Sequence, residues 1–306
     1  MSDTSRIVPI EPIQIADLPE QFKDEVVRQI RTYAVGLALE THLRRAGDEV
    51  EKEYCDFVGS GTLISWGKHY GILTADHVPQ YPRDAILRLD TRWGSKQRLR
   101  VLFEDRVNTF GFDAKALIVH SLGRPAQDTF GPDIAVIQLP LCEELSTLIA
   151  KKSFWNLTNQ TEDKLSRAMV SGSCMAIVGH PGEDVQDQVG PTGGFQEATF
   201  APGMVGFTGQ TAYFEHEGLD YIEIDSRRTV ENEAPKSYGG ISGGSLWRIP
   251  ILRRPTDDNS QVYPGELVLA GVPFWQFPEN EGLITVRGHG PRTIYQNLLS
   301  MLTASS

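Results

Sequence analysis

The stretch Tyr238-Gly-Gly-Ile-Ser-Gly-Gly-Ser-Leu-Trp247 sets Ser242 among four glycines, just before an apolar pair. Glycine lets the backbone adopt positive φ and approach a ligand without a Cβ in the way. A serine hydroxyl becomes an effective nucleophile when a base takes its proton and nearby N–H groups stabilise the developing negative charge. The stretch therefore predicts a nucleophile at Ser242, and the rest of the chain must supply a histidine and a carboxylate.

A histidine follows a predicted β-hairpin. Residues 59–66 and 70–75 have strand-like composition and flank a tight turn at 67–69. The second strand runs into Thr74-Ala-Asp-His-Val78, so His77 lies just beyond a strand end, where loops on a rigid framework often carry functional groups. A satisfied surface or core histidine is the plainer interpretation of any single histidine, but this setting favours His77 as the base.

A carboxylate opens the apolar run Gly131-Pro-Asp-Ile-Ala-Val-Ile-Gln-Leu139. At the mouth of a buried strand, Asp133 could accept the Nδ1–H of an imidazole and fix its tautomer. An ordinary turn aspartate after Gly-Pro is the alternative interpretation. Asp128 is a rival candidate, but no apolar run follows it directly.

The order His77, Asp133, Ser242 resembles that of the chymotrypsin/trypsin-like serine peptidases. The motifs Thr-Ala-Asp-His, Asp-Ile-Ala-Val-Ile and Gly-Ile-Ser-Gly-Gly-Ser resemble the family's three catalytic blocks, and 179–182 and 269–275 resemble two further segments. The resemblance covers roughly residues 55–300. It implies an all-β fold of two six-stranded Greek-key β-barrels, chymotrypsin-like, with the site between them.

The resemblance also implies the roles of the residues. Ser242 would attack the scissile carbonyl of a protein or peptide substrate, and His77 would act as general base and then general acid. Asp133 would orient His77. The N–H groups of Gly240 and Ser242 would form the oxyanion hole. The implied activity is a serine endopeptidase that works through an acyl-enzyme.

One family feature is absent from the sequence. Animal members are activated by a new Ile-Val-Gly-Gly-like N-terminus that pairs with an aspartate before the nucleophile. No such sequence precedes the expected first barrel, and Ile241 occupies the position of that aspartate. The chain therefore more closely resembles bacterial or viral members, which fold in an active form or are gated by a partner.

Substrate preference is predicted from four residues. Lys236, six residues before Ser242, lies where the family's pocket base often lies and would favour an acidic side chain; a solvated lysine is the alternative. Phe274, Trp275 and Gln276 are expected to form a cleft wall, although Trp275 also suits a core. Gln276 stands where many members have glycine and would narrow the pocket.

Two other functions compete with the peptidase. One is a catalytically silent binding module that keeps the peptidase fold. The other is an α/β-hydrolase esterase, since residues 240–244 also fit G-x-S-x-G and His289 lies downstream of Ser242. That fold needs a helix after the serine, whereas Ser245–Pro250 looks extended and ends in a proline.

Composition limits the remaining classes. The 306 residues include 29 glycines and 18 prolines, which is typical of a turn-rich β protein, and the net charge of −11 argues against broad nucleic-acid binding. The three cysteines Cys55, Cys142 and Cys174 share no metal-like spacing, and neither a secretory h-region nor an 18-residue apolar run exists. We expect no metal, no cofactor, no membrane association and a cytoplasmic location.

Three regions are expected along the chain. Residues 1–34 form an extension with a helix over about 18–33, because Phe22, Val26, Ile30 and Tyr33 recur at helical spacing. Residues 35–150 form the first barrel, including a strand at 114–120, and residues 151–306 form the second, ending in a helix at 292–302. The first helix either braces a barrel or docks a regulatory protein partner.

Overall fold

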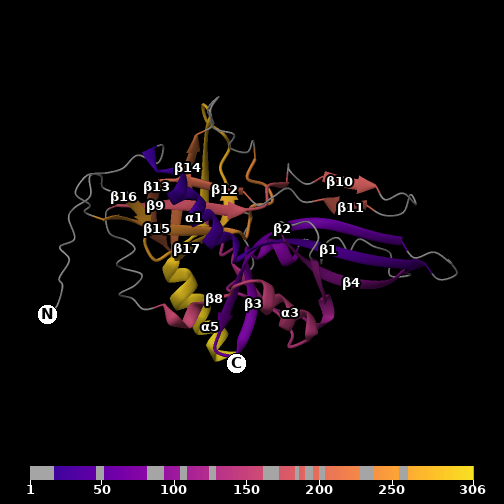
Figure 1. Cartoon of the computed structure of the whole chain (residues 1–306). Coiled ribbons are helices and arrows are strands. Elements are labelled where there is room, and N and C mark those ends of the chain that lie inside the picture. Colours follow the sequence, from indigo (N-terminus) through magenta and orange to yellow (C-terminus); the bar gives the residue numbers. More distant parts are fainter. Residues whose placement is uncertain are drawn as a thin grey trace.

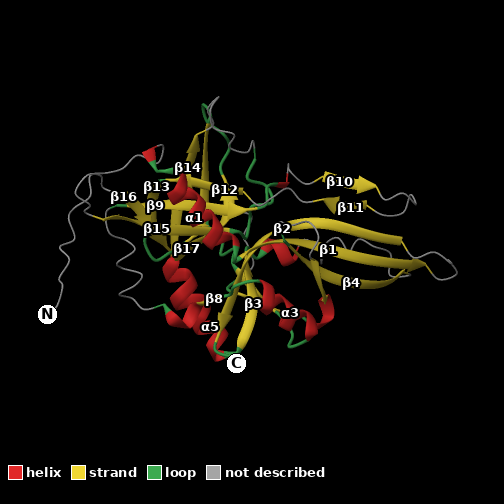
Figure 2. Cartoon of the chain, in the orientation of Figure 1, coloured by secondary structure: helices red, strands yellow, loops and turns green. Residues whose placement is uncertain are grey.

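The computed structural model describes residues 17–45, 52–80, 93–103, 109–123, 129–160, 172–182, 186–189, 196–199, 204–227, 237–254 and 261–305. Two large β-sheets dominate these residues, and helices lie against them (Figures 1 and 2). Both sheets are antiparallel except where the short strand β8 runs parallel to β2. The prediction of a β-rich chain is confirmed.

The first sheet comes from the first half of the chain. Its strand order is β5-β4-β1-β2-β3-β7-β6, with β8 paired to β2. The strands are β1 (Ala34–Arg45), β2 (Lys52–Trp66), β3 (His69–Thr74), β4 (Trp93–Leu102), β5 (Thr109–Asp113), β6 (Ile118–Ser121), β7 (Ala135–Gln138) and β8 (Trp155–Asn156). The hairpin predicted around the turn at 67–69 is present as β2 and β3.

The second sheet comes from the second half. Its order is β12-β9-β15-β17-β18-β14-β13, with β16 paired to β15, and β10 (Gln186–Val189) and β11 (Gln196–Thr199) form a separate hairpin. The strands are β9 (Ser173–Gly179), β12 (Met204–Thr208), β13 (Gln210–His216), β14 (Leu219–Arg227), β15 (Ser245–Arg254), β16 (Gln261–Pro264), β17 (Val268–Gln276) and β18 (Leu283–His289).

Each sheet has eight strands, where six per barrel were predicted. Short strands such as β8 and β16, which pair beside the main path, account for part of the excess. Among the described residues the outermost strands of each path, β5 with β6 and β12 with β13, do not pair with each other. Closure of the sheets into Greek-key barrels therefore stays a prediction.

Helices cover the sheets at both ends of the described chain. Helix α1 (Glu20–Arg31) starts after Pro19 and buries Phe22, Val26 and Ile30, the helical stripe expected from the sequence. Helix α3 (Glu143–Lys151) lies in the chain between β7 and β8 of the first sheet. The predicted C-terminal helix is present as a π-helical segment, Thr293–Leu298, that continues into α5 (Leu299–Ala304). Because the apolar stripe of α1 is covered, a partner could meet only its polar face.

The strand predicted at 114–120 is wrong over its first half. Residues Ala114–Ala116 form a 3₁₀ turn, and β6 begins only at Ile118. The carboxylate of Asp113 accepts a hydrogen bond from the Lys115 N–H at 2.9 Å. Such a side-chain cap gives the backbone a local partner that competes with a strand ladder, in spite of the apolar sequence that follows.

An aromatic cluster joins the two halves of the molecule. The ring of Trp247 from β15 lies 5.3 Å from Tyr33 and 5.0 Å from Trp155, measured between centroids. The Tyr295 hydroxyl accepts from Trp155 Nε1 at 3.0 Å and donates to the Leu269 carbonyl at 2.9 Å. These contacts fix the position of one sheet relative to the other. This matters because residues from both sheets build the candidate site.

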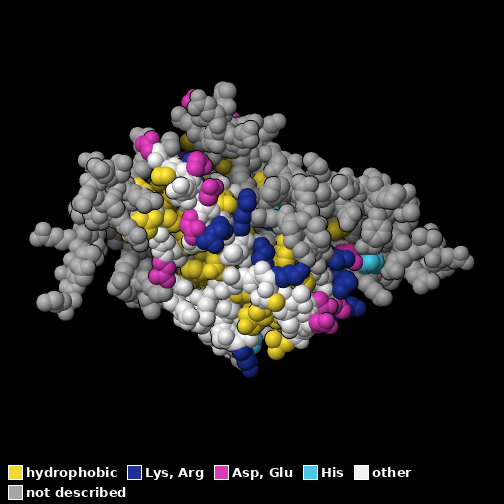
Figure 3. All heavy atoms as spheres, in the orientation of Figure 1, with side chains coloured by type: hydrophobic (Ala, Val, Ile, Leu, Met, Phe, Trp, Pro, Cys, Tyr) yellow, Lys and Arg dark blue, Asp and Glu magenta, His cyan; other side chains and the backbone are white. Residues whose placement is uncertain are grey.

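The surface mixes charges. Acidic, basic and apolar side chains all appear on the face shown in Figure 3. Within the described ranges, no helix is both long and apolar enough to cross a bilayer.

Candidate active site

The His77 and Asp133 side chains meet through two hydrogen bonds. One Asp133 carboxylate oxygen accepts the His77 backbone N–H at 2.9 Å, and the other lies 2.6 Å from His77 Nδ1. The pairing of β3 with β7, which sets Thr74 opposite Ala135, brings the two segments together. The carboxylate is buried, whereas 42% of the His77 side chain is exposed.

This contact determines the tautomer of His77. A carboxylate only accepts hydrogen bonds, so the proton of a neutral His77 sits on Nδ1 and the lone pair is on Nε2. Nε2 is then the atom that can take a proton from a hydroxyl. The arrangement suits a general base whose ring is oriented by a buried acid.

Ser242 lies against the strand end that carries His77. The Ser60 N–H donates to the Ser242 carbonyl at 3.0 Å. Gly243 has φ of +82°, and a Cβ there would lie 2.0 Å from Thr74 Oγ1 and 2.8 Å from the Ala75 nitrogen. A Cβ on Gly59 would touch both Val78 and the Ser242 carbonyl. Only glycine allows these close approaches.

The Ser242 hydroxyl and the His77 ring share no hydrogen bond in the described part of the chain. A Cβ on Gly59 would contact both the side chain of Val78, which follows His77, and the Ser242 carbonyl, so the two segments lie close together although no bond joins Oγ to Nε2. Hydrogen bonds of this kind are often long in ligand-free enzymes and tighten only with substrate.

Two backbone donors beside Ser242 are unpaired in the described part of the chain. The N–H groups of Ile241, Gly243 and Gly244 donate to Tyr238, Pro273 and Ile241 at 2.8–3.0 Å. Those of Gly240 and Ser242 donate to no protein acceptor there. Gly240 has φ of +88°, which a glycine adopts without strain. The loop thus offers the two donors that were predicted to stabilise an oxyanion.

Ser60, which the sequence analysis did not single out, fixes this loop. Its buried hydroxyl donates to the Gly240 carbonyl at 2.7 Å and accepts the His180 N–H at 2.8 Å. The Gly182 N–H donates to the Gly239 carbonyl at 2.6 Å. The carbonyls of Gly239 and Gly240 therefore both accept hydrogen bonds from other parts of the protein. No local sequence signal distinguishes Ser60 from other strand serines.

A cavity of about 100 Å³ opens beside Ser242. Phe274, Trp275 and Gln276 all line it, as predicted for a cleft wall, together with the loop itself. The Gln276 Oε1 accepts the Tyr238 N–H at 2.7 Å, so this side chain links the cavity wall to the loop around Ser242. Lys236 lies outside the described residues.

Asp76 is a second buried carboxyl next to His77, and the sequence analysis passed over it. Its side chain accepts a hydrogen bond from the Gln80 amide. Burial raises the pKa of Asp76, and the nearby Asp133 charge acts in the same direction. A second buried carboxyl therefore lies next to the His77–Asp133 pair in the chain, and the His77 side chain itself stays 42% exposed.

His289 cannot be the base of an α/β-hydrolase site. It is fully buried on β18, and its Nε2 already accepts the Asp133 N–H at 3.0 Å. The residues after Ser242 form strand β15 rather than the helix that such a fold requires. This alternative is excluded by the placement of His289 and by the strand.

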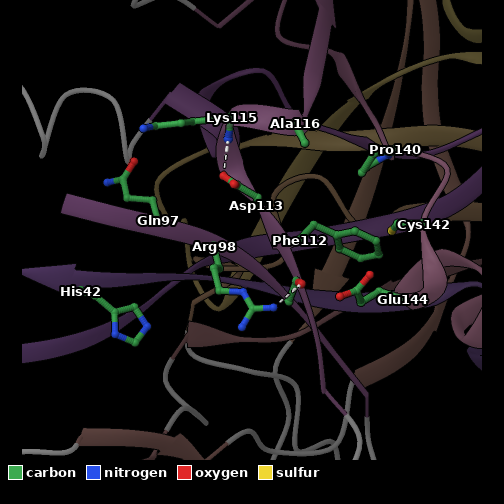
Figure 4. A pocket seen from close by; sticks show the side chains of 11 residues that line it. His42, Gln97, Arg98, Phe112, Asp113, Lys115, Ala116, Pro140, Cys142 and Glu144 are labelled. Atoms are coloured by element: carbon green, nitrogen blue, oxygen red, sulfur yellow. Dashed lines mark hydrogen bonds between the residues drawn. The ribbon is translucent and has the colours of Figure 1, made fainter.

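A larger cavity of about 760 Å³ lies away from this site, against β4, β5 and the start of α3. Figure 4 shows Arg98, Lys115, Asp113 and Glu144 around it, so its lining carries both basic and acidic side chains. It contains none of the predicted site residues. Within the described ranges, no group of three or more histidine, cysteine or acidic side chains could hold a metal ion.

Comparison with known proteins gives no assignment. No protein-family model matches the chain, and no curated protein is similar enough to count as a match. The functional argument therefore rests on the residues of the site.

Proposed function

We propose that the chain is a serine endopeptidase of the chymotrypsin-like type. One observation carries the proposal: the strand end that leads to the carboxylate-bound His77 packs against the Ser242 loop, and this loop leaves two N–H donors unpaired among the described residues. Nucleophile, base, orienting acid and anion-binding donors are the four parts that acyl transfer requires.

The reaction follows from these groups. His77 Nε2 takes the Ser242 proton as Oγ attacks the peptide carbonyl carbon, and the N–H groups of Gly240 and Ser242 bind the resulting oxyanion. His77 then gives the proton to the leaving amine as the C–N bond breaks, which leaves an acyl-serine. A water molecule, deprotonated by His77, attacks the ester carbon; as the bond from that carbon to Ser242 Oγ breaks, His77 returns the proton to Oγ and the acid is released.

The fold expected of such an enzyme completes the proposal. We propose that the two sheets curl into Greek-key barrels with the site between them, His77 and Asp133 on the first and Ser242 on the second. The supply of site residues by both sheets supports this arrangement.

The substrate side chain before the scissile bond would enter the cavity beside Ser242. The cavity is small, about 100 Å³, so a short side chain fits it better than a long one. The described residues that line it are uncharged. A short, uncharged side chain is the favoured substrate feature, and an acidic one would indicate a contribution from Lys236.

Fluorogenic peptides that differ only at this position test the proposal. Wild type is expected to cleave peptides with Ala, Val or Asn there at least tenfold faster than those with Lys or Phe, and Ser242→Ala is expected to cleave none. Cleavage by folded Ser242→Ala at the wild-type rate would refute the mechanism.

The second candidate is a binding module without activity. The lack of a bond between Ser242 Oγ and His77 Nε2 favours it. The two candidates differ in the reactivity of Ser242 toward an active-serine probe, which only the peptidase requires.

A further inference from the structure

We infer that His289 is a positioning residue: through its Nε2 the second sheet holds the backbone of Asp133, and so holds the Asp133–His77 pair in place. The inference rests on the proposed function and adds a residue to it. His289 ends β18, whereas Asp133 lies two residues before β7 of the first sheet. The 3.0 Å bond from the Asp133 N–H to His289 Nε2 therefore joins the two sheets directly behind the candidate base.

The bond determines the state of the imidazole. A backbone N–H only donates, so Nε2 must carry a lone pair and the proton of the neutral ring is on Nδ1. Nδ1 is buried and has no hydrogen-bond partner within the described residues. A buried donor without a partner destabilises the fold, because it has lost its hydrogen bond to water. An apolar side chain would avoid that cost, so the benefit of histidine at this position lies in the acceptor that it offers to Asp133.

Aromatic neighbours keep the ring in place. Phe274 stacks on it with centroids 4.5 Å apart, and Tyr221 lies 5.2 Å away. The Tyr221 hydroxyl donates to the Phe130 carbonyl at 2.6 Å, three residues before Asp133. Burial lowers the pKa of His289 to about 4, so the ring stays a neutral acceptor in the pH range in which an ordinary histidine base works.

Asp133 has few other means of holding its position. Both of its carboxylate oxygens are used by His77, and its N–H is used by His289. Without the second contact the main chain of Asp133 could shift. A misplacement of about 1 Å in a catalytic group can reduce a rate by about 10². His289 thus acts on the reaction through Asp133 and touches no substrate.

Two substitutions separate the acceptor from the packing. His289→Phe keeps an aromatic ring against Phe274 but removes the acceptor, whereas His289→Gln keeps an acceptor oxygen near the position of Nε2. The readout is the rate of Ser242 modification by a fluorophosphonate, followed by intact mass. We expect about a 10–100-fold slower rate for His289→Phe and less than about a threefold change for His289→Gln.

A double-mutant cycle tests whether the effect passes through Asp133. In an Asp133→Asn background, His289→Phe should cause no further slowing, because the orientation of His77 is already lost. An equal slowing in both backgrounds would show a general structural role and overturn the inference, as would a wild-type rate for folded His289→Phe. If that variant does not fold, His289→Leu takes its place in the cycle.

A second readout does not need activity. Proton NMR should show a resonance for the hydrogen-bonded Nδ1–H of His77, which is identified by its absence in His77→Ala. This resonance should shift or broaden in His289→Phe and stay unchanged in His289→Gln. An unchanged resonance in folded His289→Phe overturns the inference. A wild type that keeps this resonance but resists the fluorophosphonate would instead count against the proposed peptidase, so the two failures are distinguishable.

Discussion

The two sides of the candidate site are built by different means. On the first sheet, His77 and Asp133 meet through side-chain hydrogen bonds. On the second sheet, the loop around Ser242 is held by backbone bonds and by glycines packed where no Cβ fits. The His77 side of the site therefore depends on the hydrogen-bonding groups of its side chains, and the Ser242 side depends on glycines that have no Cβ. Substitutions on the His77 side should act by removing a hydrogen bond, and substitutions on the Ser242 side should act by adding atoms that clash.

The largest effect is expected on the base side. Asp133→Asn keeps the shape of the side chain but can hold His77 in the wrong tautomer, so the cleavage rate should fall by about 10⁴. The unfolding free energy should change far less. The exposed Asp56→Asn is the matched control and should leave the rate of peptide cleavage unchanged. A loss below tenfold for Asp133→Asn would show that Asp133 does not orient the base.

On the nucleophile side, Gly243→Ala should destabilise the fold. Its φ of +82° and the 2.0 Å approach of a Cβ to Thr74 Oγ1 force the loop to move, at a cost of about 3 kcal/mol or more in unfolding free energy. Gly209→Ala, where a Cβ meets nothing within 4 Å, is the control. Urea denaturation measures both. Equal stability of the two variants would contradict the close packing of the Ser242 loop.

Acid should weaken the contact between the two sides. Because burial lowers the pKa of His289 from 6.5 to about 4, only the unfolded chain takes up this proton as the pH falls through that window. The contribution of His289 to the free energy of unfolding is fully present above about pH 6.5. Protonation of His289 in the unfolded chain should lower this free energy by about 2 kcal/mol between pH 7 and pH 5. His289→Gln lacks this loss, so its unfolding free energy should fall less over the same range. If the unfolding free energies of wild type and His289→Gln fell equally with pH, the lowered pKa of His289 would be refuted.

The smallest effect concerns the hydroxyl that tethers the Ser242 loop. Ser60→Ala frees the Gly240 carbonyl and should lower kcat by about 10–100-fold with little change in KM, because the oxyanion donors lose their orientation. Ser65→Ala changes a serine of the same strand that lies opposite Tyr70 of β3, and it should match wild type. A rise in KM at unchanged kcat would mean that Ser60 acts on substrate binding instead.

Short sequence patterns predicted the features of the fold that are determined by residues close together in the sequence. The hairpin before His77 and the apolar run after Asp133 were recognisable because their signals lie within about ten residues. Ser60 and His289 were not, since each contacts a group that is 180 or 156 positions away. Nothing near either residue encodes such a partner. The prediction of six strands per barrel was wrong partly for a similar reason, because β8 and β16 are too short to leave a pattern.

The 114–120 segment shows a different limit. Its apolar, β-branched composition predicts a strand, but the Asp113 side chain caps a turn that competes with it. Here a single hydrogen bond within three residues outweighs the average preference of seven. Strand propensity mainly describes packing on a half-buried surface, and so it does not resolve where a strand begins.

Intact mass spectrometry after fluorophosphonate treatment tests the central claim most directly. Wild type should gain one adduct on Ser242, and His77→Ala and Ser242→Ala should gain none, since the hydroxyl needs its base. That result would establish a nucleophile that depends on His77. A folded wild type that stays unmodified, or a His77→Ala variant modified as fast as wild type, would contradict the account.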